Sequence, residues 1–584
     1  MACGVRWLAL LLLVPCSSAG EADLPSATAL AAQRAQYEAE VPKSILELQP
    51  FRNEMRVSIS GDAGVPGSAT LVNLNPYANS WYLLRLELPG MPAGAASYHL
   101  ENPYPLLQVL RLRADAHAVS VVNGAGTACV LWTSEGRGAL PPASASGLPY
   151  APLCDGALYL RNPVAGHHTS LERITDFLRD HVWGGDRVVN FVKEEFYRDA
   201  FLQRGAAGSS APPAPVASGP QPAPLAPQYL GRSTVTAGLA LDLGSPAREL
   251  QPGQWYAVPD LPGVFVSAIV PQDLAADFLG REAHVNPLDQ VESGALVYLV
   301  AFDLGLLDLH FVLGTDHPRL DWSERPPPAS VDLRLPGPDG VASAAPLVTN
   351  GMVSPAAAPR TIAAFAGGFK RSHGAFRFGP LAERNHGSHY GFIEQGVIFS
   401  KLQPGLATVL VGDDGAVDLR TWSAADDVLL PKLRYARQNG VPLLDYDTQL
   451  HRSLPGELVN LWGPGNWSGS SEEVLRTVRA GLCLQAAASR RFLIYGYFSA
   501  ATPSAMARVF QAYQCRYAMH LDMNALEHTY LALYLSRGGH RLVEHLIEGM
   551  EQVDRTAGNQ FAPRFLSFPD DRDFFYLTNR RADP

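Results

Sequence analysis

The chain is divided by a stretch that cannot build a core of its own. Residues 205–228, GAAGSSAPPAPVASGPQPAPLAPQ, are mostly Gly, Ala, Ser and Pro and contain no charged residue. Proline fixes extended backbone and removes hydrogen-bond donors, so this composition is typical of a semi-stiff linker. It predicts a division between an N-terminal part, residues 21–204, and a C-terminal part, residues 229–584. A length of 584 residues is ample for several domains.

The N-terminal part has the pattern of a β-sandwich or single-sheet domain. Short apolar runs such as SWYLLRLEL and ACVLWTS are separated by Gly, Pro and Asn turns. Residues 169–183 and 186–202 then repeat apolar residues at helical spacing, which predicts an appended pair of helices. No set of catalytic residue types gathers there, so the pattern gives residues 21–204 no function.

The first twenty residues, MACGVRWLALLLLVPCSSAG, have the layout of an export signal. One arginine precedes an apolar run that is too short to span a bilayer, and small residues follow. We expect cleavage after the small residues and a periplasmic or secreted protein; lipidation at Cys16 is the alternative. No later run of about twenty apolar residues predicts a transmembrane segment. The net charge of −10 disfavours nucleic acid as a partner.

Four cysteines remain after the signal, and export permits them to pair. Pairing of nearest neighbours predicts the disulfides Cys129–Cys154 and Cys483–Cys515. Four buried thiols are the other interpretation.

The last third predicts a strand–helix–strand unit. Residues 491–498 are an apolar run, residues 499–515 form an amphipathic helix with Pro503 in its first turn, and residues 516–521 are the next strand. This pattern predicts a βαβ unit with parallel strands, so we expect Asp522 and Asn524 at a carboxyl edge, where α/β sheets bind ligands. Asp522 is then a general acid/base, with Asn524 orienting substrate. Alternatively, Asp522 caps a helix over residues 524–535.

Other polar clusters follow predicted strands. Gly367 and Gly368 leave a strand just before Lys370, Arg371 and His373, which suits an anionic ligand, although a plain turn fits as well. His317 follows another strand as a candidate base or as part of an ordinary turn.

Two more features bear on the chemistry. Arg479 lies within a predicted strand and needs a partner. The histidines of HRLVEH, residues 540–545, have the wrong spacing for a zinc protease, so we expect no metal and no cofactor.

Three strings over residues 255–580 resemble the phosphodiester glycosidase family, which includes the lysosomal uncovering enzyme and bacterial exported proteins. AAFAGGFK (363–370), RAGLC (479–483) and AMHLDMN (518–524) are similar to the family strings ATFNSGFK, RSGLG and AMELDIN, in the same order. Many members instead carry N-G-G-F-F at the first motif and L-D-G-G-G-S at the last, where this chain has Ala366 and Met523-Asn524-Ala525.

The resemblance implies a mixed α/β C-terminal domain and an exported hydrolase that cleaves a glycosyl phosphodiester in an envelope or extracellular glycan. Asp522, with Asn524 and His373, would do the catalytic work. A second set would hold the phosphate and substrate: Gly367, Gly368, Lys370, Arg371, Arg479 and His317. The missing glycine run supports an alternative, a non-catalytic glycan-binding or scaffold protein on the same fold.

Overall fold

The computed structural model describes mainly residues 44–60, 65–88, 95–114, 118–169, 199–317, 339–370, 390–461, 476–557 and 560–580, with short gaps inside some ranges. The predicted export signal and nearly all of the two helices predicted within 169–202 lie outside the described residues. The described part is rich in strands, and the pairings within its sheets are antiparallel. None of its helices is long and apolar enough to cross a membrane.

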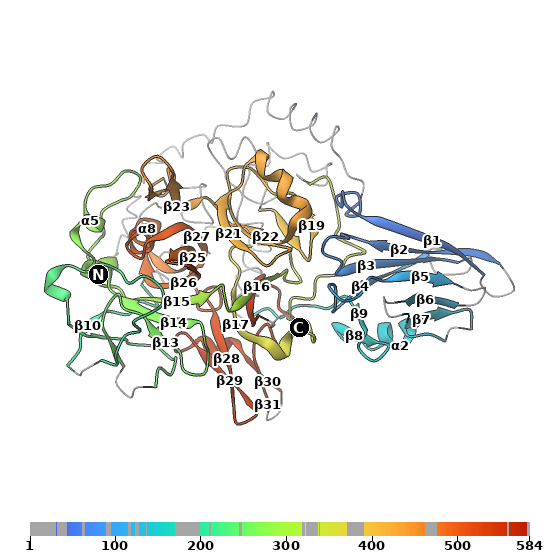
Figure 1. The fold of residues 1–584 in the computed structure, drawn as a ribbon, viewed down its shortest axis with the longest axis horizontal. Helices are drawn as coiled ribbons and strands as arrows, with labels where there is room; N and C mark the ends of the chain where they lie inside the picture. Colours follow the sequence, from blue (N-terminus) through green and yellow to red (C-terminus); the bar gives the residue numbers. More distant parts are fainter. Residues whose placement is uncertain are drawn as a thin grey trace, which may run out of the picture.

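The N-terminal part folds as two packed sheets, which confirms its β-rich character. The larger sheet has the order β1 (Asn53–Ser60), β2 (Pro66–Asn73), β3 (Trp81–Glu87), β4 (Ala95–Glu101), β9 (Leu158–Arg161) and β8 (Tyr150–Leu153). The smaller sheet consists of β5 (Arg111–Ala114), β6 (Ala118–Val122) and β7 (Ala128–Thr133), and the short helix α2 (Leu140–Ala145) follows it. These strands lie at the right of the molecule in Figure 1.

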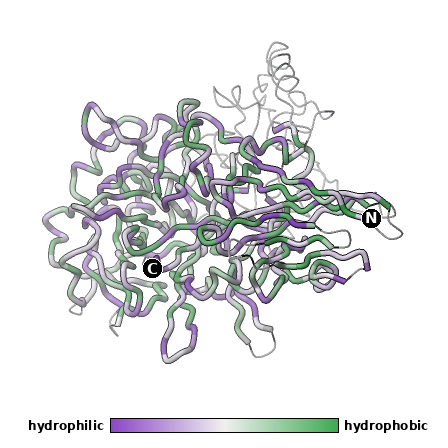
Figure 2. Tube along the Cα trace, turned by 45° about the vertical axis from the view of Figure 1, so that its right-hand side comes forward, coloured by the Kyte–Doolittle hydropathy of each residue, from purple (hydrophilic) through white to green (hydrophobic). Residues whose placement is uncertain are grey.

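Strand β3 is apolar on both faces because both faces are covered. Tyr82 and Leu84 point into the core between the two N-terminal sheets, whereas Trp81 and Leu83 join the core of the C-terminal part. Cys129 of β7 and Cys154, just after β8, form the first predicted disulfide and connect the two sheets. In Figure 2 hydrophobic and hydrophilic residues alternate along these long strands.

The C-terminal part is built on an eight-stranded sheet. Its order is β13 (Tyr256–Ala257), β14 (Val264–Ile269), β15 (Val297–Asp303), β26 (Arg490–Ala501), β25 (Thr477–Ala487), β27 (Cys515–Met523), β23 (Pro442–Asp447) and β24 (Arg452–Pro455). The helix α8 (Pro503–Ala512) joins β26 to β27 and packs on one face through Met506, Val509 and Phe510. The predicted helix is therefore confirmed. The second predicted disulfide, Cys483–Cys515, connects β25 to β27.

Two five-stranded sheets complete the C-terminal part. One has the order β16 (Leu307–Val312), β32 (Phe574–Asn579), β17 (Thr361–Ala366), β28 (Leu531–Arg537) and β29 (His540–His545). The other has the order β19 (Val397–Ser400), β18 (Phe392–Glu394), β22 (Leu433–Gln438), β20 (Ala407–Gly412) and β21 (Val417–Thr421). Their apolar residues merge with the second face of the eight-stranded sheet into one core.

Minor elements fill the connections between these sheets. They are the short strands β10 (Ala206–Ala207), β11 (Thr234–Val235) and β12 (Glu249–Leu250), the pair β30 (Arg555–Ala557) and β31 (Gln560–Ala562), the helix α5 (Ala276–Leu279), and the 3₁₀ turns η4 (Pro227–Tyr229), η5 (Pro271–Asp273), η6 (Glu292–Gly294), η8 (Ala358–Arg360), η9 (Ala424–Lys432) and η10 (Met550–Val553).

The C-terminal part has fewer helices and less parallel pairing than the expected mixed α/β fold. β26 and β27 do run in the same direction, joined by α8, but β25 lies between them and pairs antiparallel with both. The strand–helix–strand unit is thus present without a parallel ladder. Asp522 still lies at the carboxyl end of its strand, although the neighbouring strand β25 begins there rather than ending there.

Two local predictions are wrong and one is confirmed. The strand-like sequence of residues 295–314 predicts a hairpin across Gly305. No such hairpin forms, because β15 belongs to the eight-stranded sheet and β16 pairs with β32 in another. Residues 524–535 are not a helix: a turn leads into β28 at Leu531. Two β-rich runs around Asp413-Asp414-Gly415 predict a hairpin, and β20 and β21 confirm it.

The predicted linker is extended, but it is held against the C-terminal part. The backbone N–H of Val216 donates to the carbonyl of Trp255 at 2.9 Å, and that of Gln221 donates to the side chain of Gln485 at 2.7 Å. Ala223 is buried in the core on the helix face of the eight-stranded sheet. Small side chains and proline allow this close packing, so the segment contributes to a core that it could not build alone. The domain boundaries themselves stay a prediction.

Candidate active site at the end of strand β27

Asp522 ends a buried strand and is itself buried, so its charge requires compensation. Its Oδ1 accepts a hydrogen bond from the backbone N–H of Met523 at 2.8 Å. Its Oδ2 accepts one from Nη1 of Arg572, also at 2.8 Å. Because no helix follows, Asp522 is not the N-cap that the alternative interpretation required. It is one half of a buried ion pair.

Asn524 turns the chain away from the sheet. Its φ of 79° lies in the left-handed region, which asparagine tolerates better than most residues other than glycine. Its backbone N–H donates to the carbonyl of Val478 at 2.9 Å, which holds the turn against β25. Asn524 therefore adopts the kind of backbone conformation that glycine favours, at the position where the resembled family has glycine.

The partner of Asp522 comes from a charged segment that the sequence analysis did not single out. Residues 570–573, Asp-Asp-Arg-Asp, directly precede β32, and all four are buried. Asp570 pairs with Arg564 at 2.7 Å, and Asp573 pairs with Arg437 at 3.2 Å. Four consecutive charges directly before an apolar strand were the available signal, because buried charges must each find a partner.

His528 extends the ion pair into a network. Its Nδ1 lies 2.8 Å from the carbonyl oxygen of Met523, and its Nε2 lies 2.7 Å from Nη2 of Arg572. A carbonyl only accepts and a guanidinium only donates, so Nδ1 carries the proton and Nε2 is the acceptor. The neutral imidazole is thus fixed in one tautomer. Glu527 lies beside it, with Oε1 3.3 Å from the same Nε2.

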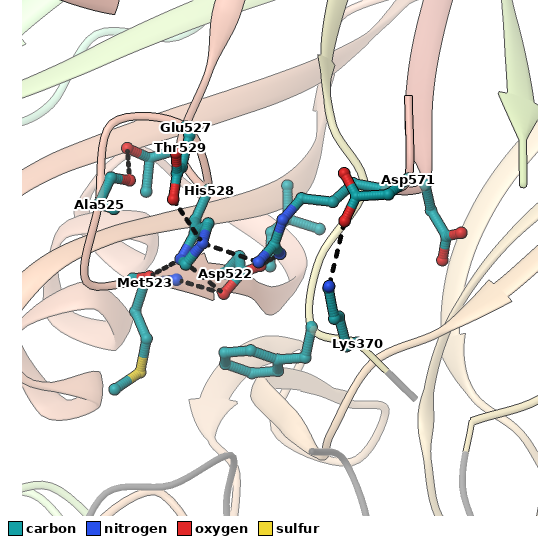
Figure 3. Close-up of polar contacts among 12 residues, drawn as sticks. Lys370, Asp522, Met523, Ala525, Glu527, His528, Thr529 and Asp571 are labelled. Atoms are coloured by element: carbon teal, nitrogen blue, oxygen red, sulfur yellow. Dashed lines mark hydrogen bonds and ion pairs between the residues drawn. The ribbon is translucent and has the colours of Figure 1, made fainter. Parts of the chain in front are cut away.

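Lys370 lies on the other side of the charged segment, as Figure 3 shows. Its Nζ is 3.1 Å from Oδ2 of Asp571 and 3.9 Å from Oδ2 of Asp316. Lys370 is thus paired with Asp571, the residue next to Arg572, so two cations contribute to this part of the site. His168 also reaches Asp571 and Asp316, at 3.4 Å each.

These contacts include the one set of three metal-donor side chains found in the part of the chain that the structure describes. His168, Asp316 and Asp571 offer atoms that all lie within 4.8 Å of one another. A metal ion there would compete with the ammonium of Lys370, which already neutralises the two carboxylates. Local patterns in the sequence do not predict this cluster, because its members are 148 and 255 positions apart.

The glycine turn after β17 is shaped by protein side chains. Gly368 has a φ of 130°, and a Cβ atom there would lie 2.6 Å from Nη1 of Arg437 and 2.8 Å from Oδ1 of Asn439. The same Oδ1 accepts a hydrogen bond from the backbone N–H of Phe369 at 3.1 Å, and the Asn439 amide reaches the carbonyl of Leu521 at 2.7 Å. Arg437 and Asn439, which the sequence analysis missed, thus connect the glycine turn to β27.

Arg479 is fully buried beneath this region rather than displayed on it. Its Nε donates to the carbonyl of Ala501 at 2.7 Å, and Nη1 contacts the sulfur of Met523 at 2.9 Å. Burial lowers the pKa of Arg479 to about 9, against an opposing effect of Glu292. Burial, with the charge of Arg479, also lowers the pKa of the adjacent His520 well below its usual value.

The other predicted residues fall into two groups. Nδ1 of His317 lies 2.7 Å from Oδ1 of Asp573. Burial alone would raise the pKa of Asp573, but His317 and Arg437 hold this pKa below its usual value. Gly367 joins the same group through its backbone, which donates to the carbonyl of Asp573 at 2.8 Å. Arg371 and His373 lie outside the described residues.

Comparisons with known proteins give only distant likenesses. No family model matches the sequence, and no curated protein matches it. Among solved structures, the catalytic domain of zebrafish N-acetylglucosamine-1-phosphodiester alpha-N-acetylglucosaminidase, auto-inhibited by its pro-peptide, is similar at a TM-score of 0.29 and 11% identity, over 64% of this chain and 100% of that chain.

Two further solved structures match with still lower scores. A hypothetical protein from Synechocystis has a TM-score of 0.24 and 12% identity, over 90% of this chain and 98% of that chain. A putative exported protein from Burkholderia pseudomallei has a TM-score of 0.21 and 9% identity, over 92% and 98%. These scores are too low to carry an argument about fold or activity, so the family resemblance stays a prediction from sequence motifs.

Proposed function

We propose that the protein is an exported hydrolase that cleaves the bond between a sugar anomeric carbon and a phosphate oxygen in a glycan. The observation that carries this proposal is the buried Asp522–Arg572 pair at 2.8 Å, with Lys370 bound to the residue next to Arg572. One carboxylate and two cations are the groups that such a reaction uses. The three motifs shared with phosphodiester glycosidases add support from the sequence.

The roles follow from charge. Lys370 and Arg572, each already paired with a carboxylate, would donate hydrogen bonds to the phosphodiester and stabilise the charge that builds on phosphate as the bond to the anomeric carbon breaks. Asp522, paired with Arg572 at 2.8 Å, would stabilise the positive charge that develops on the sugar ring. Water then forms the new bond to the anomeric carbon and loses a proton to solvent, and the electron pair of the broken bond leaves with the phosphate oxygen.

Two disulfides fit an oxidising compartment and hence an exported protein. The second candidate, a non-catalytic glycan-binding protein, rests on Met523-Asn524-Ala525 in place of a glycine run. The left-handed backbone of Asn524 weakens that objection to catalysis, because the turn is made without glycine.

The test is release of reducing sugar from a panel of glycosyl phosphodiesters by the purified protein. We expect Asp522→Asn to lower turnover by about 100-fold or more, because the loss of a preorganised charge acts on the transition state. Asp277→Asn, an exposed residue of α5, is the control. Circular dichroism and thermal unfolding would confirm that both variants fold. Wild-type turnover by a folded Asp522→Asn protein, or no turnover of any substrate by the wild type, would rule the proposal out.

A further inference from the structure

A cleft that contains several charged side chains, far from Asp522, is formed between the hairpin β20–β21 and the strands of the eight-stranded sheet. It has a volume of about 590 Å³, within the range of ligand pockets. Residues of β21 form one wall, and residues of β23, β25, β26 and β27 form the other. Tyr517 of the cleft and Asp522 are five positions apart on β27, or about 17 Å along the strand. The cleft is therefore a separate site.

The charges that line this cleft cancel. Three arginines and three aspartates contribute to it: Arg420, Arg491, Arg516, Asp418, Asp426 and Asp445. An anionic ligand would face three carboxylates, and a cationic ligand would face three guanidinium groups. A ligand that suits both must be neutral, and it must donate to carboxylates while accepting from guanidinium groups. Hydroxyl groups do both.

The polar groups are held in place by one another. Arg420 bridges Asp418 at 2.6 Å and Asp426 at 2.8 Å. Thr421 donates to Asp445 at 3.1 Å, and its hydroxyl lies 3.0 Å from that of Tyr517. A cleft whose hydrogen-bonding groups are already fixed loses little conformational entropy when a ligand binds.

An aromatic ring completes the lining. Tyr446 of β23 is half-buried, and the guanidinium of Arg516 lies 4.4 Å from the centre of its ring. The ring offers an apolar surface among polar groups, which suits a ligand that alternates C–H faces with hydroxyl groups.

The cleft also continues past Arg491. A second cleft of about 310 Å³ lies on the other side of this residue, lined in part by Asp303, Asp414 and Arg490. Arg491 lines both clefts, and its Nη2 donates to the carbonyl of Val417 at 2.5 Å. The two clefts together follow β21, so an extended ligand fits them better than a compact one.

We propose that this cleft binds a neutral, linear oligosaccharide along β21. The site does not depend on turnover at Asp522, and it would hold a glycan chain whether or not the protein is an enzyme.

Isothermal titration of the full chain with maltohexaose, cellohexaose and hexa-N-acetylchitohexaose tests the proposal. We expect at least one to bind, and both Tyr446→Ala and Thr448→Trp to weaken it by about tenfold, the first by removing the ring and the second by filling the cleft. Tyr77→Ala, an exposed tyrosine of the N-terminal part, is the matched control. Binding that survives both cleft substitutions, or no binding by any of the three, would overturn the proposal.

Two further arms separate this site from others. Asp522→Asn should bind the hexasaccharide as the wild type does, so loss of turnover and loss of binding are independent outcomes. Competition by inorganic phosphate or by an extended peptide, measured in the same titration, would assign the cleft to another class of ligand and would also overturn the proposal.

Discussion

At the scale of single residues, the candidate site is defined by how buried charges are paired. The four residues 570–573 each meet a different partner, and three of these pairings join segments that are far apart in the sequence, whereas Asp570 and Arg564 are six positions apart. Burial and ion pairing have opposite effects on these carboxyl groups: burial raises the pKa of Asp570 to about 6, although Arg564 lowers it. Loss of Arg572 would leave the buried carboxylate of Asp522 without its ion-pair partner, which costs more than the pair itself contributes.

Gly368 tests this packing directly. Gly368→Ala should lower the free energy of unfolding by about 3 kcal/mol, since the new Cβ would displace Arg437 and Asn439 and strain the backbone. Gly538→Ala is the matched control: its φ of 59° is also positive, but no atom lies within 4 Å of the added Cβ. Urea denaturation measures both, and equal losses would show that the close approach at Gly368 contributes nothing.

At the scale of elements, α8 sets the direction in which β27 runs. Pro503 begins the helix, and Oγ1 of Thr502 accepts a hydrogen bond from the backbone N–H of Ala505 at 3.3 Å. The backbone N–H of Thr502 in turn donates to Glu292 at 2.9 Å, which ties the start of the helix to the segment before β15. The end of β27, and with it Asp522, depends on this connection.

Replacement of the N-cap residue Thr502 should therefore lower the stability of the protein. We expect Thr502→Ala to lower the free energy of unfolding by about 1 kcal/mol, because an N-terminal helix donor loses its acceptor. Thr502→Ser keeps the hydroxyl and should cost less. The shift of the urea midpoint reports both changes, and equal shifts would assign the effect to lost packing of the methyl group instead.

At the scale of the whole molecule, the N-terminal sheet is fixed to the rest by buried polar contacts. Arg161 pairs with Glu101 at 2.6 Å and donates to the carbonyl of Val348 at 3.1 Å, and the hydroxyl of Tyr150 donates to the carbonyl of Met352 at 3.0 Å. Near this junction, Glu394 of β18 accepts a hydrogen bond from Leu313 at 3.0 Å. Burial raises the pKa of Glu394 to about 8, against the opposing charge of Arg161.

This raised pKa predicts a pH-dependent stability. Between its ordinary pKa of 4.5 and about 8, the folded protein keeps the proton that the unfolded chain has lost, so stability falls as the pH rises through this window. The slope from this group is at most about 1.4 kcal/mol per pH unit. Glu394→Gln keeps an acceptor for Leu313 but cannot ionise, and it should flatten the slope. Unfolding at pH 4.5, 6 and 8 measures it, with exposed Glu54→Gln as control; parallel slopes for Glu394→Gln and wild type would contradict the prediction.

The sequence by itself determined the local features of this protein. Apolar periodicity predicted α8, the D-G turn predicted the hairpin β20–β21, and spacing predicted both disulfides, because each depends on residues close together in the chain. The position of Asp522 at the end of a strand was predicted for the same reason.

Only the tertiary structure decided what these features are paired with. The hairpin predicted across Gly305 became two strands of different sheets, because β15 pairs with β14 and β26 whereas β16 pairs with β32. Arg572, Arg437 and His528 surround the site through contacts between distant segments. A buried charge must be compensated, but its partner can come from anywhere in the chain. The local sequence therefore indicates that a partner is needed without indicating which residue it is.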